Sequence, residues 1–555
     1  MATYFWVGGT GTWSATGNTQ FAITSGGVPT LLNPIAGDIV NFDSNSGTGT
    51  CTTAAGAVTT QCILNSATLG LILGANFTIS NAFTLTSGSL SLGSSTLSCR
   101  NFLTNSADVR TIDFGTGNIT LTGSAMTIWT SPTSTNLTAL GSRTVNCTYA
   151  GSTGTRTIST SSAAGTESAQ VNFYVTAGSD TLTVGSGCRT LDLTGFAGTL
   201  TNSARVVYGN LVISSGVTLT AGNNTTTFAA TSGTQQITTN NKTLDFPITQ
   251  NGVGGTVQLQ DNLTMGSTRS FTLTNGALDL NNLVLSTGFF ASSNSNIRSI
   301  AFGTGKMVVT GNAASIFVMT VFTNCTITGT GLVEATYSGS TGTRRLDFGA
   351  GGESNAITLK VTAGSDIISL RTTNSAYKDL DFTGFSGSAS LGNSIYIYGN
   401  LITSSGMTWS SSTASITFGA TSGAKTITTA NKTLDFPIVF NGSGGTFVFQ
   451  DSLTQGSTRL FTIANGTIKL KENTTNTVGS LITLLSNVKY LQTATAGTQA
   501  IISQASGTIS PNYLNVKDIS AQGGAVWNAY TVNNNVDAGN NYGWNFGGKF
   551  MPMFG

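Results

Sequence analysis

The chain has 555 residues, of which 39% are apolar and 8% are charged, and its net charge is +2. This balance provides no cluster of Lys and Arg for nucleic acid or anionic membranes, and it is too apolar and too weakly charged for a disordered protein. The chain contains no His, which excludes Ser-His-Asp and Cys-His nucleophiles and His-ligated zinc or iron, and leaves only carboxylate-based catalysis open.

Residues 1–70 differ from the rest of the chain because aromatic residues, including Trp6 and Trp13, are concentrated there among turn-forming residues. We interpret them as an N-terminal cap or attachment region, since an uncapped stack of strands would expose its core and its edges. The first residues, Met1-Ala-Thr-Tyr-Phe-Trp6, lack the basic and apolar parts of a secretory signal. No stretch is apolar for long enough to span a membrane. We therefore expect synthesis in a cytoplasm, no signal peptide and no membrane insertion.

The centre of the chain is an internal duplication with a period of about 190 residues. Asn241-Lys-Thr-Leu-Asp-Phe-Pro-Ile248 recurs at residues 431–438, and the segment that begins at Tyr149 recurs from Tyr337. A closed domain does not readily accept a doubled middle, whereas a stack whose layers contact only their neighbours simply becomes longer. The duplication therefore predicts a solenoid.

The copies divide the chain into five predicted segments. These are the N-terminal region 1–70, a first repeat unit at 71–270, a second unit at 271–460, a partial third repeat at 461–509, and a C-terminal cap with an apolar tail at 510–555. The C-terminal cap again gathers Trp and Tyr residues. The last residues, 549–555, are apolar without periodicity, so we expect them to dock against another surface.

Short apolar alternations within the units predict β-strands. Phe271-Thr-Leu273, Leu278-Asp-Leu280 and Leu283-Val-Leu285 have a period of two, and the Asn-Gly and Asn-Asn pairs between them tolerate the left-handed backbone of tight corners. We predict an all-β protein that folds as a parallel β-helix with capped ends. An array of β-sandwich domains is the alternative, but such domains repeat at about 100 residues, roughly half of the observed period.

Both ends of the chain resemble virion appendage and surface-filament proteins of bacteriophages and bacteria, tail fibres and tailspikes among them. The resemblance is carried by Tyr4-Phe-Trp-Val-Gly-Gly-Thr-Gly-Thr-Trp13 and Gly37-Asp-Ile-Val-Asn-Phe-Asp43 near the start, and by residues 513–518 and 539–546 near the end. The middle is similar only in its Thr/Asn turns and apolar alternation. The resemblance implies a right-handed parallel β-helix that assembles as a homotrimer. Its motifs are capping features and imply no catalytic residue.

The six Cys residues form no CxxC pair, and their equivalents in the other copy are not Cys. Cys147 aligns with Ala335, and Cys188 aligns with Tyr377. A disulfide needs both partners, whereas a buried apolar position accepts several residue types. We therefore predict free, packed thiols.

Paired carboxylates are the remaining enzymatic hypothesis, because glycan-cleaving enzymes use one as an acid and another as a base or nucleophile. Ten of the 21 acidic residues are copied, as the pairs Glu167 and Glu353, Asp180 and Asp366, Asp192 and Asp381, Asp245 and Asp435, and Asp261 and Asp451. Seven Asp residues lie between apolar residues of period-two runs, so we expect them to face solvent as a solubility device. These are Asp113, Asp192, Asp245, Asp279, Asp347, Asp381 and Asp435. Three unpaired acids, Glu334, Asp379 and Glu472, form no site that the sequence can assemble.

Two loops with oxygen ligands, Asp43-Ser-Asn-Ser46 and Asp537-Ala-Gly-Asn-Asn541, lack the spacing of a calcium loop, and we interpret them as Asx turns. Gly-rich pieces such as Gly8-Gly-Thr-Gly11 lack the Lys-Ser/Thr ending of a phosphate-binding loop. We predict no catalytic, metal-binding or cofactor-binding residue, no cofactor and no enzymatic activity.

Thr, Ser and Asn side chains along the strands suit sugar recognition, since a hydroxyl or an amide both donates and accepts hydrogen bonds. Stacked turns should also align like residues into ladders. The sequence thus predicts a structural and adhesive virion protein, a tail fibre or spike that contacts host cell-surface glycans, other virion proteins and copies of itself, but no nucleic acid. The alternatives are a tailspike that depolymerises polysaccharide with paired carboxylates, and a bacterial surface filament or adhesin located on the cell.

Overall fold

The chain folds as two compact units, which we call unit 1 (Met1–Asp279) and unit 2 (Leu280–Gly555). The computed structural model describes residues 1–161, 167–312, 315–372 and 374–547. The described residues contain 63 strands and three short 3-10 helices, which are η1 (Glu167–Ala169), η2 (Glu353–Asn355) and η3 (Thr531–Asn533). None of the described helices has the length and hydropathy needed to cross a membrane.

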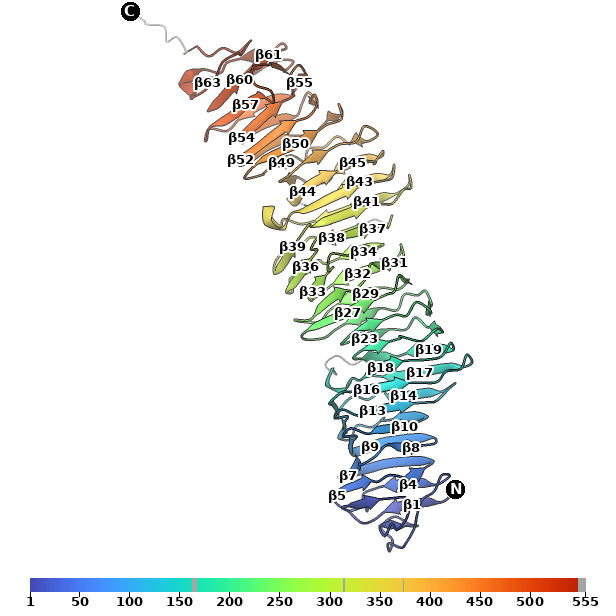
Figure 1. Ribbon diagram of the computed structural model, residues 1–555. Helices are drawn as coiled ribbons and strands as arrows, with labels where there is room; N and C mark the ends of the chain where they lie inside the picture. Colours follow the sequence, from blue (N-terminus) through green and yellow to red (C-terminus); the bar gives the residue numbers. More distant parts are fainter. Residues whose placement is uncertain (162–166, 313–314, 373, 548–555) are drawn as a thin grey trace, which may run out of the picture. The chain divides into compact units, whose positions relative to one another are not determined.

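Within each unit a strand pairs in parallel with the strand one turn further along the chain (Figure 1). In unit 1, β10 (Thr96–Cys99) pairs with β13 (Asn118–Leu121), which pairs with β16 (Thr144–Cys147). In unit 2, β37 (Lys306–Val309) pairs with β40 (Leu332–Ala335). Both units are therefore parallel β-solenoids of the right-handed β-helix type, with about 22 turns between them. The predicted fold class is confirmed, and the alternative of sandwich domains is wrong.

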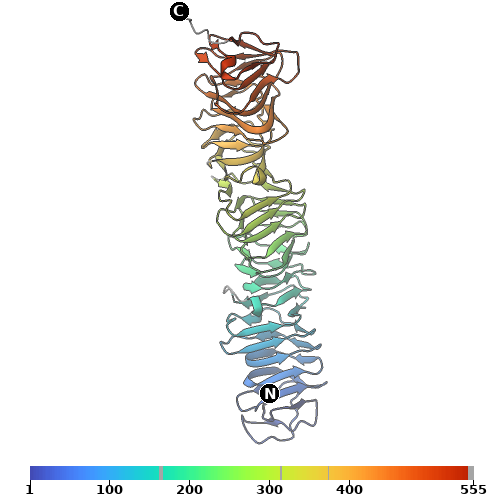
Figure 2. The same cartoon turned by 90° about the vertical axis from the view of Figure 1, so that its left-hand side faces the viewer.

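The strands of one turn lie above those of the preceding turn, as the second view of each unit also shows (Figure 2). A 15-stranded sheet of unit 1 contains one antiparallel ladder, between β1 (Thr3–Trp6) and β3 (Phe21–Ala22) at the N-terminal end. The stacked arrangement explains the short strands, because each turn must bend at its corners before the next strand can begin.

Apolar side chains point into each unit and alternate with polar ones that point outward. In β32 (Ser270–Leu273), Phe271 and Leu273 are buried while Thr272 is half-buried, as the period-two pattern predicts. Parallel register then places like side chains on top of one another. The rings of Phe83 and Phe102 stack at 5.3 Å, and those of Phe102 and Trp129 at 4.7 Å, with interplanar angles of 11° in both pairs.

Asn side chains form ladders at the corners. In unit 1 the Asn275 amide donates to the Asn251 side-chain oxygen at 2.7 Å. In unit 2, Asn465 donates to Asn441 at 2.8 Å, and Asn487 donates to Asn465 at 2.7 Å. The predicted hydrogen-bonded ladders of like residues are thus present in both units, where they tie adjacent corners together.

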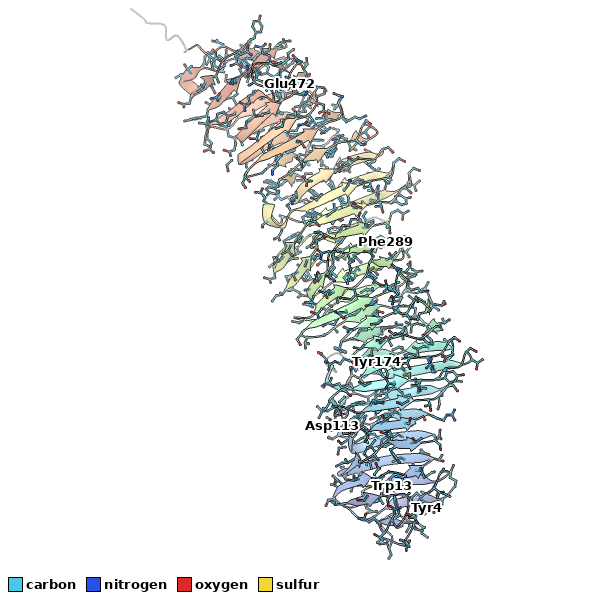
Figure 3. The ribbon with its side chains drawn as sticks, in the orientation of Figure 1. Tyr4, Trp13, Asp113, Tyr174, Phe289 and Glu472 are labelled. Carbon is cyan, nitrogen blue, oxygen red and sulfur yellow. The ribbon has the colours of Figure 1, made fainter. Side chains whose placement is uncertain are left out.

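Aromatic side chains fill the first and last turns. Trp6 and Trp13 are fully buried and contact the Phe21 ring at 5.2 and 5.7 Å; Trp13 is labelled in Figure 3. In the last turns of unit 2, Trp527 is buried against Trp544 at 4.9 Å. The predicted docking tail, residues 549–555, lies outside the described residues.

Each unit encloses one bidentate ion pair. In unit 1, Nε and Nη2 of Arg156 donate to the two carboxylate oxygens of Asp180, at 2.9 and 2.8 Å. In unit 2, Nε and Nη2 of Arg344 donate to the two carboxylate oxygens of Asp366, each at 2.8 Å. All four side chains are buried. Both oxygens of each Asp accept charge-assisted bonds, which compensates the cost of removing the charges from water.

A second type of buried cation binds backbone carbonyl groups. Arg110 and Arg298 occupy equivalent positions in the two copies, and Lys489 occupies the same position in the partial third copy. The Lys489 ammonium donates to three carbonyl oxygens of the loop just before it, at 2.7, 2.7 and 2.8 Å, and Arg298 donates to the carbonyl of Ser292 at 2.6 Å. The cation thereby donates hydrogen bonds to carbonyl groups of the corner loop, which lie outside the strand ladders.

One buried Arg of unit 1 is poorly compensated. Arg205 donates through Nη2 to the Thr201 carbonyl at 2.9 Å, whereas Nε and Nη1 have no hydrogen-bond partner among the described residues. Burial lowers the pKa of Arg205 to about 10. Its register partner Thr226 is also buried, and its hydroxyl has no partner there either.

Unit 2 shows how the same position is filled without a charge. The equivalents of Arg205 and Thr226 are Ile395 and Ile416, which face each other in the same register. Two buried Ile side chains need no hydrogen-bond partner. Burial of Arg205 and Thr226 without a full set of hydrogen bonds therefore destabilises unit 1, and the two Ile residues of unit 2 avoid this cost.

We expect the double variant Arg205→Ile/Thr226→Ile to be more stable than the parent by about 1–4 kcal/mol, because apolar residues replace an incompletely paired buried charge. Thermal unfolding followed by far-UV circular dichroism measures the change in midpoint. Arg156→Leu is the control, and it should lower the midpoint since it leaves Asp180 buried without its partner. An unchanged or lower midpoint for the double variant would contradict this account.

The six cysteines are buried free thiols, as predicted. Burial raises the pKa of Cys99, Cys147 and Cys188 to about 12. Since the thiolate is the reactive form, we expect a thiol reagent at mildly alkaline pH to label none of the six in the folded protein and all six after denaturation. Rapid labelling of the folded protein would show that these turns open.

Candidate functional site

The copied acids serve the structure in the same way in both units. Besides the buried pairs, Asp245 accepts from Arg269 at 2.6 Å and Asp435 accepts from Arg459 at 2.7 Å. The hydrogen bond from Arg459 is the main cause that lowers the pKa of Asp435. These carboxylates are held by a cation in each copy, which is the arrangement of a structural ion pair rather than of an acid-base pair.

A further copied pair binds the backbone. Asp261 accepts from the amide and the hydroxyl of Thr239 at 2.9 and 3.0 Å, and Asp451 accepts from the same two groups of Thr429 at the same distances. Each carboxylate thus fixes a corner one turn away. Asp192 and Asp381 also bind equivalent backbone amides, those of Thr194 and Thr383. Four of the five copied pairs therefore form ion pairs or backbone hydrogen bonds that are present in both copies.

The seven Asp residues predicted to face solvent are all half-buried on the outer side of their strands, and the structure gives several of them a further task. Asp113, labelled in Figure 3, accepts from the Gly115 amide at 3.0 Å. Asp192 likewise accepts from the Thr194 amide at 2.8 Å. They close Asx turns at the ends of strands, and so they specify corners as well as solubility.

The remaining acidic candidates each have a separate partner. Glu334 pairs with Lys306 at 2.7 Å, and Glu472 pairs with Lys471 at 2.9 Å. Asp43 and Asp537 accept from backbone amides two residues ahead, at 2.9 and 3.0 Å, so both loops are the predicted Asx turns. No group of three metal-ligating side chains occurs in the part of the chain that the structure describes.

A surface cavity of unit 2 brings together residues from several turns of the solenoid. It has a volume of about 340 Å³ and is lined by Glu353, Lys378, Asp379, Tyr398, Asn400 and Lys425. Glu353 belongs to η2, Lys378 and Asp379 to β44 (Ser375–Asp381), and Lys425 to β50 (Ala424–Thr428), while Tyr398 and Asn400 lie between β46 (Ile395–Ile397) and β47 (Leu401–Ile402). We call this cavity groove 2.

Hydrogen bonds fix the polar floor of groove 2. The backbone and side-chain amides of Asn400 donate to one Asp379 oxygen at 2.7 and 2.9 Å, and the other oxygen accepts from Thr358 at 3.1 Å. The Asn400 side-chain oxygen accepts from the Thr426 amide at 2.8 Å. The floor is therefore held across neighbouring turns before any ligand arrives, which lowers the entropy cost of binding.

Glu353 closes one side of groove 2. One of its carboxylate oxygens accepts from the Thr421 hydroxyl at 2.7 Å, although the two residues are 68 positions apart. The Tyr398 ring lies parallel to the Tyr396 ring, at 6.1 Å and 14°. Burial, and then the nearby Tyr396 and Glu353, raise the pKa of Tyr398, so its hydroxyl stays protonated and able to donate.

Unit 1 carries the same groove. A cavity of about 450 Å³ is lined there by Glu167, Arg189, Tyr208, Asn210 and Gln235, the equivalents of Glu353, Lys378, Tyr398, Asn400 and Lys425. We call it groove 1, and a second cavity of about 670 Å³ adjoins it and shares three of these residues. Glu167 of η1 accepts from the Thr231 hydroxyl at 3.0 Å, just as Glu353 does from Thr421.

Among these equivalent residues the charge differs at two positions, whereas Arg189 in place of Lys378 keeps the charge. Asp379 and Lys425 of groove 2 are replaced in groove 1 by Thr190 and Gln235. The contact of Asp379 with the backbone amide is kept, because the Asn210 backbone amide donates to the Thr190 hydroxyl at 3.3 Å. A carboxylate and an ammonium thus give way to two uncharged groups. Unit 1 has a further cation, Arg143, in the adjoining cavity, where the equivalent residue that lines groove 2 is Gly331.

Neither groove was predicted from the sequence, because no motif joins residues that lie on successive turns. A signal was present in the copied tetrapeptide Tyr-Gly-Asn-Leu, at residues 208–211 and 398–401. The copied Glu167 and Glu353 were considered only as candidate acids. Their position in each groove follows from the stacking of turns.

Comparisons with known proteins give no relative for this chain. No protein-family model matches it, and neither a curated protein nor a solved structure is significantly similar to it. Function is therefore inferred from the two units themselves.

Removing one partner of a buried ion pair should destabilise its unit strongly. We expect Asp180→Asn and Asp366→Asn each to lower the free energy of unfolding by about 3–5 kcal/mol, because the Arg is left buried without its counter-charge. Asp192→Asn is the matched control and should change it by less than about 0.5 kcal/mol, since the amide oxygen can still accept from Thr194. Denaturant unfolding measures all three variants. If both buried-pair variants unfolded with the same free energy as the parent, the two Asp residues would not be needed for stability.

Proposed function

We propose that this protein is a structural and adhesive virion appendage, a tail fibre or spike, that contacts glycans on the host cell surface. The single observation that carries the proposal is the conservation of one surface groove in both copies of a duplicated solenoid. Duplication lengthens a solenoid by whole turns of about 4.8 Å each. Because the groove is kept in both copies, we infer that the outer surface has a binding role in addition to the length that the duplication adds.

The chemistry of the groove supports recognition of sugars. Tyr398 offers an aromatic face with a hydroxyl at its edge, and Lys378, Asp379 and Glu353 offer donors and acceptors around it. Sugar rings present apolar C–H faces and a rim of hydroxyl groups that both donate and accept. Cavities of about 300–1,000 Å³ are typical of sites for small molecules, and both grooves fall within this range.

The use of the acids favours adhesion over cleavage. The acids that recur in both units bind cations, backbone amides or corner hydroxyls, and the two acids of groove 2 bind Thr421 and Asn400. Groove 1 has Thr190 at the position of Asp379, so the two grooves do not share a carboxylate pair. A hydrolase would need two carboxylates in working positions.

The resemblance of the chain ends to phage appendages supports the virion location, association with other virion proteins, and assembly of the protein as a homotrimer. In this proposal the protein is made in the host cytoplasm and reaches the outside on the particle.

Antibodies against the purified full-length protein should decorate virus particles that carry it, and the purified protein should compete with those particles for adsorption to host cells. Electron microscopy and an adsorption assay measure the two effects. Labelling of the bacterial surface in the absence of particles would favour the adhesin instead. Release of reducing sugar from host polysaccharide, abolished by Glu353→Gln, would favour the depolymerase.

A further inference from the structure

We propose that each unit carries its own saccharide-binding site, so that one chain binds two uncharged oligosaccharide segments at once. This inference rests on the proposed function, since it assigns the glycan contact to groove 1 and groove 2. Four features support it. These are the side chains that the grooves share, the replacement of both Asp379 and Lys425 by uncharged residues in groove 1, the rigid floor of each groove, and the separation of the two sites.

The shared side chains place the same residue types in both grooves. Each groove has a Tyr, a long cation, a Glu and an Asn at equivalent positions. In groove 2 the half-buried Tyr398 offers part of its ring to a sugar, whereas Tyr208 of groove 1 is only 7% exposed. In both grooves a long cation, the Arg189 guanidinium or the Lys378 ammonium, donates to hydroxyl groups of the ligand. Lys378 and Arg189 are both exposed, so their charged ends can reach a ligand in the cavity.

The paired replacement indicates that the ligand is uncharged. If the ligand were an anion, groove 1 would be expected to keep the additional cation Lys425 and lose only Asp379. Instead both charges are absent, and Gln235 and Thr190 still offer hydrogen-bonding groups at these positions. At these two positions the grooves exchange charged groups for uncharged ones while keeping hydrogen-bonding capacity, which suits a ligand recognised through hydroxyl groups.

The rigid floor makes both sites preformed. Asn210 is held by Thr190 and by the Gln236 amide, which donates to its side-chain oxygen at 2.9 Å. Asn400 is held in the same way by Asp379 and Thr426. A preformed site binds a weakly interacting ligand such as a sugar without first having to order its own side chains.

The two sites are separate because each one lies within a single unit. The residues of groove 1 fall between 167 and 235, and those of groove 2 fall between 327 and 425. They share no side chain, so a substitution in one groove should leave the other intact.

The test counts bound ligands by native mass spectrometry of the full-length protein with short uncharged hexose oligosaccharides, and with uronic-acid oligosaccharides for comparison. Two variants address one groove each, Glu167→Gln/Arg189→Ala and Glu353→Gln/Lys378→Ala, and a third combines them. Lys517→Ala, an exposed cation outside both grooves, is the matched control. The thermal midpoint of every variant confirms that it folds.

We expect two ligands per chain on the parent and on the control, one per chain on each single-groove variant, and none on the combined variant. A maximum of one ligand per chain on the parent, loss of both ligands from a single-groove variant, or a preference for uronic-acid ligands would overturn the inference. A parent that binds no oligosaccharide but still competes for host adsorption would overturn the inference and leave the proposed function standing. A parent that does neither would overturn both.

Discussion

The structure depends on the parallel register between one turn of chain and the next. Strands of the inner turns pair with strands of the turns on both sides, so an inner turn is stable only where its strands align with both neighbours. Register also fixes what each side chain meets. Phe83, Phe102 and Trp129 stack because they occupy the same place in successive turns, and so do Asn441, Asn465 and Asn487.

The same register explains why charged groups can lie inside the units. Arg156 and Asp180 are 24 positions apart, yet they meet because one turn separates them. The carbonyl-binding cations Arg110, Arg298 and Lys489 show that a corner needs a buried donor but not a particular side chain. A Lys serves where two copies have an Arg, because several carbonyl oxygens converge on one point and any long cation can reach it.

Sequence patterns predicted the strands, the corners and the solenoid because these depend on nearest neighbours. Phe271 and Leu273 alternate with polar residues, and Asn281 and Asn282 adopt the positive φ angles expected at a corner, 52° and 65°. The sequence pattern also predicted that the Asp245 side chain faces outward. It could not predict that Arg269 is its partner, since the number of residues in a turn varies. The grooves were out of reach for the same reason. Glu353, Lys378 and Tyr398 come together only when three turns of unequal length are stacked.

The near-repetition of residues 241–248 at 431–438 has a consequence for how such genes change. Recombination between the two copies would delete or add about 190 residues at a time, and the junction would join two corners that already fit each other. Each event would remove or supply one complete groove along with its turns. Lineages of this protein would then differ in length by whole multiples of the period of about 190 residues, and in the number of ligands that a single chain can bind.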